Sequence, residues 1–339
     1  MDLPTVSVLM PVFNGERFLR EAIDSILAQS MPDFEFIIVD DGSEDDSWRI
    51  IQSYHDDRIR AFHRPHEGLV SSLNFGVSVA QSDWIARMDA DDVSSPDRFR
   101  MQLEAISGHP EIAVLGGQCF VMNESGYQLS STRAPENHEH LIRNTLYGGH
   151  SLCHPSVILN KVALEKVGGY RSRFLCAEDV DLWLRICEVG VLRCLPYPVL
   201  KLRKHDSNVS LDDRGRTQTI YALAARACYL RRKAGLSDPS ELNETRWRGF
   251  VREIETVCDL LGVFRARIAG QRIFTVLSSV GRSGHFAFVR RAMRLAILLI
   301  WEPSLIHGLS RRPWLRALRH LAGSKGAAGA SRRLFRLRY

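Results

Sequence analysis

The sequence predicts an α/β fold, in which a mostly parallel sheet flanked by helices is followed by an α-helical C-terminal extension. Three observations predict it. Through the first 107 residues, short apolar runs alternate with segments of helical periodicity, which is typical of βαβ units on a parallel sheet. Two of the apolar runs end in groups of aspartates, and beyond about residue 212 only helical patterns occur. The length of 339 residues fits about two domains.

The first half of the predicted sheet consists of four strands, each predicted from an apolar run. Val6–Phe13 is almost continuously apolar, as expected for a strand buried on both faces. After Asn14-Gly15, apolar residues recur every three or four positions, which indicates a helix. Ser43 is a suitable N-cap for the helix that follows the second strand. The alternation predicts strands at 34–39, 59–62 and 84–88, and helices at 16–29, 44–51, 68–80 and 97–106.

From about residue 109 the pattern is less regular. Leu192–Leu202 has the composition of a strand but contains two prolines, which predicts a position at the edge of the sheet. The remaining predicted strands are 113–115, 119–122 and 157–159, and the predicted helices are 135–146, 163–167 and 178–189. We expect four segments in all: a domain over 1–211 with halves 1–107 and 108–211, a basic helical extension over 212–323, and a flexible basic tail over 324–339.

Aspartates gather where two of the predicted strands end. Asp40 and Asp41 end the second strand, and Asp89, Asp91 and Asp92 follow the fourth. Ligands bind outside the carboxyl ends of the strands in such sheets. Neighbouring carboxylates repel one another unless a cation or hydrogen-bond donors neutralise them, and Mg²⁺ typically binds carboxylates together with substrate phosphates. A metal–diphosphate site is one interpretation. A solvated acidic turn before a helix is the other.

The common phosphate-binding loops are not found. No G-x-G-x-x-G follows the first strand, and the chain has no G-x-x-x-x-G-K-[ST]. A dinucleotide-binding Rossmann site is therefore disfavoured, and a P-loop is excluded.

Several motifs occur in a characteristic order. They are VSVLMPVFNGERFLREAIDSILAQ at 6–29, FIIVDDGSEDDS at 36–47, IARMDADDVSSPDRF at 85–99, HPSVI at 154–158, VGGY at 167–170, AEDVDLWLRI at 177–186 and RKHDSNVS at 203–210. Together they resemble the family 2 glycosyltransferases of the GT-A fold, over about residues 5–211. The resemblance implies inverting transfer of a sugar from a nucleotide-diphosphate donor, often a UDP-sugar. The halves 1–107 and 108–211 would then bind the nucleotide and the acceptor.

The resemblance also implies roles for individual residues. Asp179 matches the general base, and Glu178 is the other member of its acidic pair. The residues that match donor contacts are Pro11, Phe13, Glu16, Asp41, Arg64 and Asp89. Those that match ligands of a divalent metal, Mn²⁺ or Mg²⁺, are Asp89, Asp91, Asp92 and His205. Arg203 matches a position near the diphosphate.

This chemistry needs one base and one electrophile. The base takes the proton of the acceptor hydroxyl, and the electrophile stabilises the leaving diphosphate. The function that the resemblance implies is a metal-dependent inverting transfer to a hydroxyl of a glycan or lipid-linked acceptor in surface polysaccharide assembly. The alternative is a non-catalytic subunit that binds nucleotide sugars, or acts as a scaffold, within a membrane polysaccharide complex.

Positive charge is concentrated near the C-terminus. The formal net charge is +6, but thirteen Lys or Arg and one acid give residues 281–339 a charge of +12, which leaves −6 for residues 1–280. Within 281–323, apolar and cationic residues separate by helical face, which suits an anionic membrane surface. A helical cap packed on the catalytic domain is the alternative. Nucleic acid is not expected as a partner because no recognised module is present.

The cellular location is predicted from three features. The N-terminus has no signal-like segment, and no apolar run reaches the ~20 residues that a spanning helix needs. The seven cysteines are scattered without a CxxC pair, which is typical of reduced thiols. We expect a cytoplasmic protein, with peripheral binding to the inner face of the cell membrane through 281–323.

Membrane binding by the basic segment has a direct test. We expect full-length protein to float with phosphatidylglycerol vesicles, because each Lys or Arg near an anionic surface contributes about 1 kcal/mol. A variant truncated after residue 280 should stay in the pellet fraction. Equal flotation of the two proteins would contradict the prediction.

Overall fold

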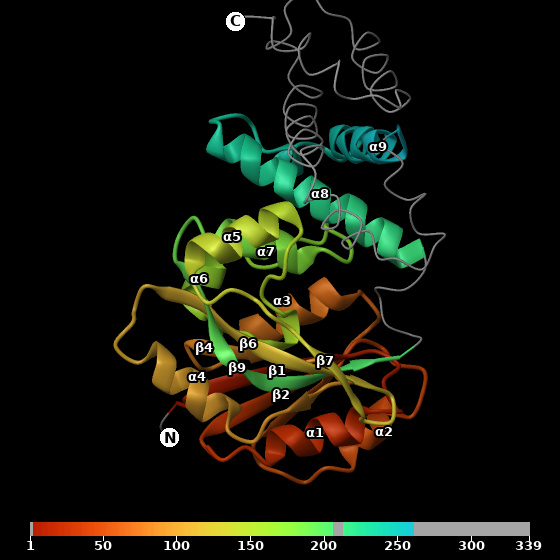
Figure 1. Cartoon of the computed structure of the whole chain (residues 1–339). Helices are drawn as coiled ribbons and strands as arrows, with labels where there is room; N and C mark the ends of the chain where they lie inside the picture. The colour runs from red at the N-terminus through yellow and green to blue at the C-terminus, as the bar shows by residue number, and fades with distance from the viewer. Residues whose placement is uncertain (1–2, 206–212, 261–339) are drawn as a thin grey trace, which may run out of the picture. The chain divides into compact units, whose positions relative to one another are not determined.

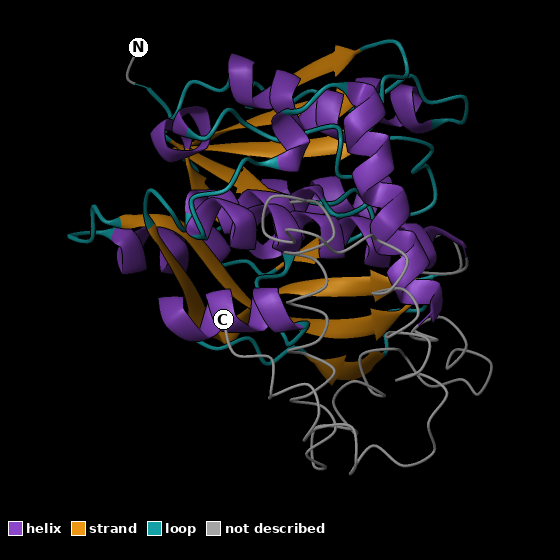
Figure 2. Ribbon diagram, turned by 90° about the horizontal axis from the view of Figure 1, so that it is seen from above, coloured by secondary structure: helices purple, strands orange, loops and turns teal. Residues whose placement is uncertain are grey.

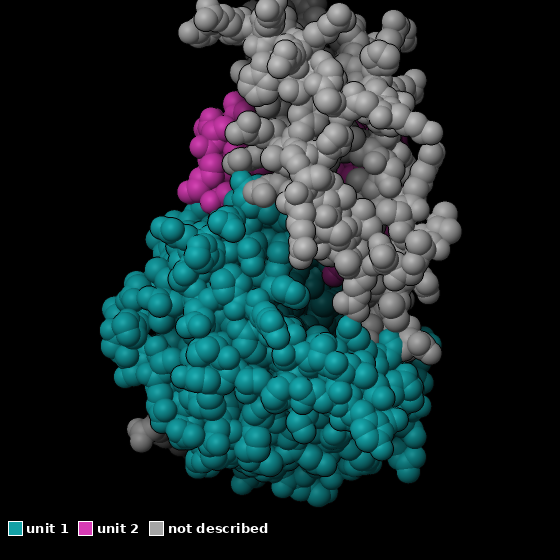
Figure 3. Space-filling view, viewed as in Figure 1, with its two compact units in different colours: residues 1–211 teal, residues 212–339 magenta. Residues whose placement is uncertain are grey.

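The computed structural model describes residues 3–205 and 213–260. The chain divides into two compact units, residues 1–211 and residues 212–339 (Figure 3). The described part of the first unit holds a mixed sheet with helices on both faces, and the described part of the second consists of helices (Figures 1 and 2).

The sheet begins with four parallel strands. They are β1 (Val6–Val12), β2 (Phe34–Asp40), β3 (Ile59–His63) and β4 (Trp84–Arg87). Their spatial order is β3-β2-β1-β4, so the chain builds outward from β1 on one side and then returns to place β4 on the other. Such a reversal is a topological switch point, where an open α/β sheet leaves a crevice at the carboxyl ends of its strands.

The other strands extend the sheet beyond β4. They are β5 (Val93–Ser94), β6 (Ile112–Asn123), β7 (Gln128–Ser131), β8 (Ile158–Asn160) and β9 (Val191–Lys204). The full order is β3-β2-β1-β4-β8-β6-β9-β5, with β7 paired to β6. Strand β8 is antiparallel to both β4 and β6, whereas β6 and β9 are parallel. The sheet is thus parallel from β3 to β4 and mixed in the rest.

Helices cover both faces of this sheet. One face packs against α1 (Leu19–Leu27), α2 (Ser47–Gln52) and α4 (Arg98–Ile106), and the other against α3 (Leu69–Val79), α5 (His138–Tyr147), α6 (Lys161–Lys166) and α7 (Glu178–Ile186) (Figure 1). Alternate residues of β1 divide between the two cores: Val8 belongs to the first, and Leu9 to the second. Helix α3 lies so close to β1 that a Cβ on Gly76 would be 2.1 Å from Leu9 Cδ1.

One local prediction holds for part of its strand, and one was wrong. Strand β9 pairs with β6 along one side, whereas on its other side β5 pairs only with Leu200 and Lys201, so within the described residues the stretch that carries the two prolines is an edge, as predicted. The β6–β9 register also shifts there, between the pairs Gly117–Leu195 and Gln118–Pro198. Ser43 does not cap α2, which begins at Ser47, because the Ser43 hydroxyl accepts a hydrogen bond from the Asn14 main-chain N–H instead.

The described part of the second unit, residues 213–260, contains two long helices, α8 (Asp213–Lys233) and α9 (Glu244–Leu260), joined through a short 3₁₀ turn at Pro239–Glu241. They pack through Tyr221 and Trp247, whose ring centroids are 6.4 Å apart. In the described residues, no helix is both long and apolar enough to cross a bilayer. The basic segment 281–323 and the tail 324–339 lie outside the described residues.

Candidate active site

The loops after β1 and β2 are joined to each other. Asn14 adopts a left-handed backbone conformation (φ 50°), which turns the chain sharply at the end of β1. Its side-chain oxygen accepts from the Glu44 N–H at 2.8 Å, and its own N–H donates to Ser43 Oγ at 2.9 Å. Glu16 reaches the same loop, where Oε2 accepts from the Asp46 N–H at 2.9 Å. These bonds fix the two strand ends against each other.

Asp41 organises the loop that follows β3. Its Oδ1 accepts from the Glu67 N–H and the Ser72 hydroxyl, each at 3.0 Å, and its Oδ2 accepts from the Gly68 N–H at 2.9 Å. The residue is only 3% exposed. A buried carboxylate with several donors is well satisfied, so Asp41 holds the loop in one conformation.

The side chains beside Asp41 form an aromatic pair at the surface. Phe13, just past β1, stacks on the imidazole of His66 with centroids 4.1 Å apart and planes inclined by 22°. Phe13 is 47% exposed. Arg64 packs over the Phe75 ring at 4.1 Å and pairs with Glu67, whereas Pro11 is buried within β1.

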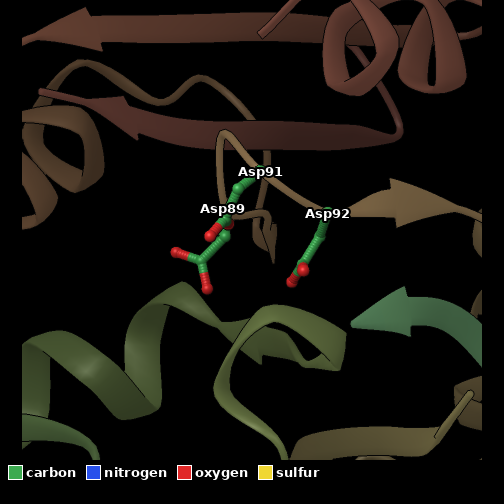
Figure 4. A group of neighbouring side chains, drawn as sticks. All are labelled: Asp89, Asp91 and Asp92. Carbon is green, nitrogen blue, oxygen red and sulfur yellow. The ribbon is translucent and has the colours of Figure 1, made fainter. Parts of the chain in front are cut away.

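Three carboxylates converge after β4. Asp89, Asp91 and Asp92 each offer an oxygen, and these oxygens lie within 4.8 Å of one another (Figure 4). Each also has a partner in the protein. Asp89 pairs with Arg87 Nη1 at 2.5 Å, Asp91 Oδ2 lies 2.7 Å from His205 Nε2, and Asp92 Oδ1 accepts from the Arg203 N–H at 2.8 Å.

The environment of Asp91 and Asp92 opposes their ionisation. Burial, followed by repulsion from Asp91, raises the pKa of Asp92 well above its ordinary value. Burial and then the charge of Asp89 likewise raise the pKa of Asp91, although His205 opposes the shift. In addition, Asp92 Oδ2 is buried without a hydrogen-bond partner. Clustered oxygens with one unsatisfied lone-pair site are the donor set that a hard divalent cation prefers, so these residues fit such a metal.

Arg203 fixes this acidic loop from strand β9. It is 3% exposed, and its guanidinium donates to the main-chain oxygens of Asp91 and Glu124, each at 2.9 Å, and to the carboxylate of Glu21. With its donors engaged in this way, Arg203 positions the loop that carries the aspartates.

A second acidic pair lies at the start of α7. Glu178 and Asp179 occupy its first turn, where the helix dipole favours negative charge. Cys176, two residues before the helix, has a left-handed backbone (φ 56°), an uncommon conformation for a residue other than glycine. Asp181 faces inward instead and forms a buried ion pair with Arg185, at 2.7 Å. Asp179 is only partly buried, so of the three acids it combines first-turn placement with access to solvent.

Glu178 is the buried member of the pair. It is 7% exposed, and burial together with the charge of Asp179 raises its pKa to about 7. His154 Nδ1 lies 3.9 Å from Glu178 Oε1, and His154 Nε2 is 2.8 Å from the Tyr170 hydroxyl. Burial lowers the pKa of His154 well below its usual range. The charge of Asp89 also contributes to the raised pKa of Glu178, which places the two acidic groups within electrostatic reach of each other.

Comparisons with known proteins identify the family. The sequence pattern of "Glycosyl transferase family 2" matches residues 7–168. EpsE of Bacillus subtilis, which carries the name of a glycosyltransferase, is 36% identical over 197 residues, or 55% of this chain and 68% of that protein. The chain belongs to the family 2 glycosyltransferases. MJ1057 of Methanocaldococcus jannaschii, named as an uncharacterized glycosyltransferase, is 30% identical over 55% of this chain and 65% of its own length.

A solved structure agrees in fold. The crystal structure of S. aureus TarS 1-349 in complex with UDP-GlcNAc aligns with a TM-score of 0.59 at 16% identity, covering 91% of this chain and 93% of that one. The predicted fold class and the predicted enzyme class, a glycosyltransferase, are both confirmed.

Some residues around the site of this glycosyltransferase were not predicted from its sequence. Arg87, the partner of Asp89, is an arginine within an otherwise apolar strand, and that contrast was the available signal. Tyr170 was quoted only as part of a motif, and its bond to His154 joins two motifs that are separate in the chain. The donors to Asp41 come from residues 67, 68 and 72, which only the folded loop brings there.

The raised pKa of Glu178 predicts a pH-dependent stability of the glycosyltransferase. Because its pKa is about 7 when folded against an ordinary 4.5, the folded state binds more protons in that interval, and stability falls as pH rises from 4.5 to 7. Glu178→Gln removes this titration. We expect the unfolding free energy of the wild type, relative to Glu178→Gln, to fall by about 1–3 kcal/mol across the interval.

Urea unfolding at a series of pH values measures this difference. Glu188→Gln, which replaces an exposed acid just beyond α7, is the matched control for the substitution itself. A Glu178→Gln difference that is constant between pH 4.5 and 7 would show that Glu178 titrates normally.

Proposed function

We propose that this glycosyltransferase transfers a sugar from a nucleoside-diphosphate donor, of the UDP-sugar class, to a hydroxyl of a glycan or lipid-linked acceptor in surface polysaccharide assembly. The observation that carries the proposal is the cluster of Asp89, Asp91 and Asp92, whose oxygens lie within 4.8 Å of one another at the switch point of the sheet. TarS, which shares the fold, was solved with UDP-GlcNAc and with UDP.

The nucleoside would bind at the ends of β1 and β2. Phe13 offers an exposed aromatic face for stacking, and Asp41 offers a carboxylate and a main-chain oxygen that can accept from a base N–H. Pro11 and Glu16 shape the same loop, and Arg64 supplies positive charge beside it. Stacking provides affinity for any base, whereas acceptor groups favour a base with a ring N–H.

The diphosphate would bind at the end of β4 together with a divalent cation, Mn²⁺ or Mg²⁺. Asp91, Asp89, Asp92 and His205 are the residues that would hold the cation. When bound, such a cation stabilises the negative charge of the departing diphosphate. Arg87 and Arg203 keep the aspartates in place before any ligand arrives.

Asp179 would act as the general base. It is the accessible acid in the first turn of α7, and its Oδ1 is oriented by the Val180 N–H at 2.7 Å. In a single displacement it would take the proton of the acceptor hydroxyl as that oxygen attacks the anomeric carbon, and the diphosphate would leave from the opposite face. Glu178 would lie beside Asp179 on the buried side of the helix, where its Oε1 is 3.9 Å from His154 Nδ1.

A thermal-shift panel tests the proposal. The full chain is incubated with UDP, GDP, CDP and their sugars, with and without Mn²⁺ or Mg²⁺. A ligand that binds only the folded state raises the melting temperature by mass action. We expect stabilisation by uridine nucleotides that increases with metal. Stabilisation by none of the nucleotides in either metal would contradict the proposal.

A further inference from the structure

His66 lies in the place that a nucleobase would need. Its ring stacks on the exposed face of Phe13, with centroids 4.1 Å apart. Its Nδ1 is 3.1 Å from the main-chain oxygen of Asp41 and 2.9 Å from Asp41 Oδ2. A carbonyl oxygen can only accept a hydrogen bond, so Nδ1 carries the hydrogen. The imidazole therefore presents a flat ring to Phe13 and a ring N–H to Asp41.

These two contacts are the ones that a bound base would make. A base that stacks on Phe13 and donates its ring N–H to Asp41 needs the same aromatic face and the same acceptors as His66. His66 Nδ1 lies 2.9 Å from Asp41 Oδ2, so it occupies the position from which a base would donate to that oxygen. The same carboxylate also accepts from the N–H groups of Glu67 and Gly68 and from the hydroxyl of Ser72.

We propose that His66 is a gate that occupies the nucleobase subsite in the ligand-free enzyme and swings out when the donor binds. This inference rests on the proposed function, because it assumes that Phe13 and Asp41 receive the base. His66 is thereby a specificity-determining residue: a ligand must compete with a ring that already stacks and donates at this position.

The loop is built so that the side chain can leave. Its main chain is held by the bonds from Glu67 and Gly68 to Asp41, which do not involve the imidazole. Gly42 packs directly against the main chain of this loop, since a Cβ on Gly42 would lie 2.8 Å from the main-chain nitrogen of His66. By contrast, the His66 side chain is 55% exposed. Rotation of the side chain into solvent breaks only the stack on Phe13 and the contacts to Asp41.

Removal of the gate should tighten nucleotide binding. The apparent dissociation constant is the intrinsic one divided by the fraction of molecules with an open subsite. One aromatic stack and one hydrogen bond together favour the closed state modestly. We expect His66→Ala to lower the Kd of UDP, measured by calorimetry with Mg²⁺ on the full chain, about five- to tenfold.

His63→Ala is the matched control. His63 is 49% exposed and pairs with the neighbouring carboxylate, Asp40, at 2.6 Å, but its ring lies beside Trp48 and not beside Phe13. The Kd of UDP for this variant should stay within about twofold of the wild-type value. Phe13→Ala should weaken UDP binding, because it removes the stacking face from open and closed states alike.

A spectroscopic measurement tests the movement in the wild-type protein, and so does not depend on the folding of a variant. The ring current of Phe13 should move the Cε1–H signal of His66 upfield in the free enzyme at pH 8. Saturating UDP with Mg²⁺ should return the signal to the position of an exposed histidine. The signal is assigned by its loss in His66→Ala.

The possible outcomes separate the two proposals. If the wild type binds no nucleotide, the proposed function fails and the gate fails with it. If the wild type binds UDP but His66→Ala binds it equally or more weakly, the gate alone is wrong. The gate is equally overturned if the His66 signal stays upfield in the complex, because the imidazole would then be a fixed platform against the base.

Discussion

Asp179→Asn should abolish sugar transfer while leaving donor binding almost unchanged. The amide has the same shape as the carboxylate but cannot accept the proton of the acceptor hydroxyl. Loss of a positioned general base typically costs a factor of about 10²–10⁴ in rate. The Kd of UDP should stay close to the wild-type value, because the base and the diphosphate are assigned to the loops after β1, β2 and β4.

Initial rates of nucleotide release and calorimetry on the same preparation measure both effects. Glu188→Gln changes an acid beyond the other end of α7 and should retain the wild-type rate. Asp181 is unsuitable as a control because its ion pair with Arg185 is buried, so its substitution would perturb the helix itself. Full activity of Asp179→Asn would refute the assignment of the base.

Asp91→Asn should also cause a large loss of transfer activity, and it should weaken binding of the divalent metal. Replacing one carboxylate of the cluster removes a charged oxygen ligand, and stabilisation of the leaving group by a metal is worth several kcal/mol. We expect the transfer rate at fixed Mn²⁺ to fall by about 10²-fold or more. The metal-dependent part of UDP binding should disappear, whereas the weak binding of uridine, which has no diphosphate, should persist.

Asp97→Asn provides the matched control for this variant. Asp97 is a half-buried acid near the same loop, where it pairs with Ser30 and Arg100, and its substitution should leave rate and binding unchanged. Metal-dependent UDP binding by Asp91→Asn at the wild-type level would show that the cluster does not hold the cation.

Much of the fold follows from local pattern. The central strands β1 and β2 are buried along their whole length, so their sequences are largely apolar. The limits predicted for β1–β4 agree with the structure to within about a residue. The second half was harder to predict. The 12-residue strand β6 contains Gly116 and Gly117, which interrupt its apolar pattern, and the sequence predicted two short strands in its place. A Cβ on Gly117 would lie 2.5 Å from Val199, so tertiary packing requires the glycine there.

In the candidate site, too, the sequence predicts some features and only the folded structure reveals the others. Aspartates at strand ends are visible in the sequence because the carboxyl ends of parallel strands meet at one edge. Their partners are not visible, since pairing depends on the three-dimensional return of β9 and of the β3–α3 loop. Arg203 matched a diphosphate contact by resemblance, yet its guanidinium donates to Asp91, Glu124 and Glu21. His66 lies two residues after Arg64, which matched a donor contact by resemblance, but only the fold places the His66 ring on Phe13.

The stereochemistry of donor cleavage tests the central claim most directly. The full chain is incubated with a UDP-sugar that it binds and with Mg²⁺, and the first-formed sugar product is followed by proton NMR before its anomers equilibrate. A single displacement assisted by Asp179 predicts metal-dependent release of UDP and a first product whose anomeric configuration is opposite to that of the donor. A first product with the donor's configuration, or binding of the donor without any cleavage or transfer, would contradict the account.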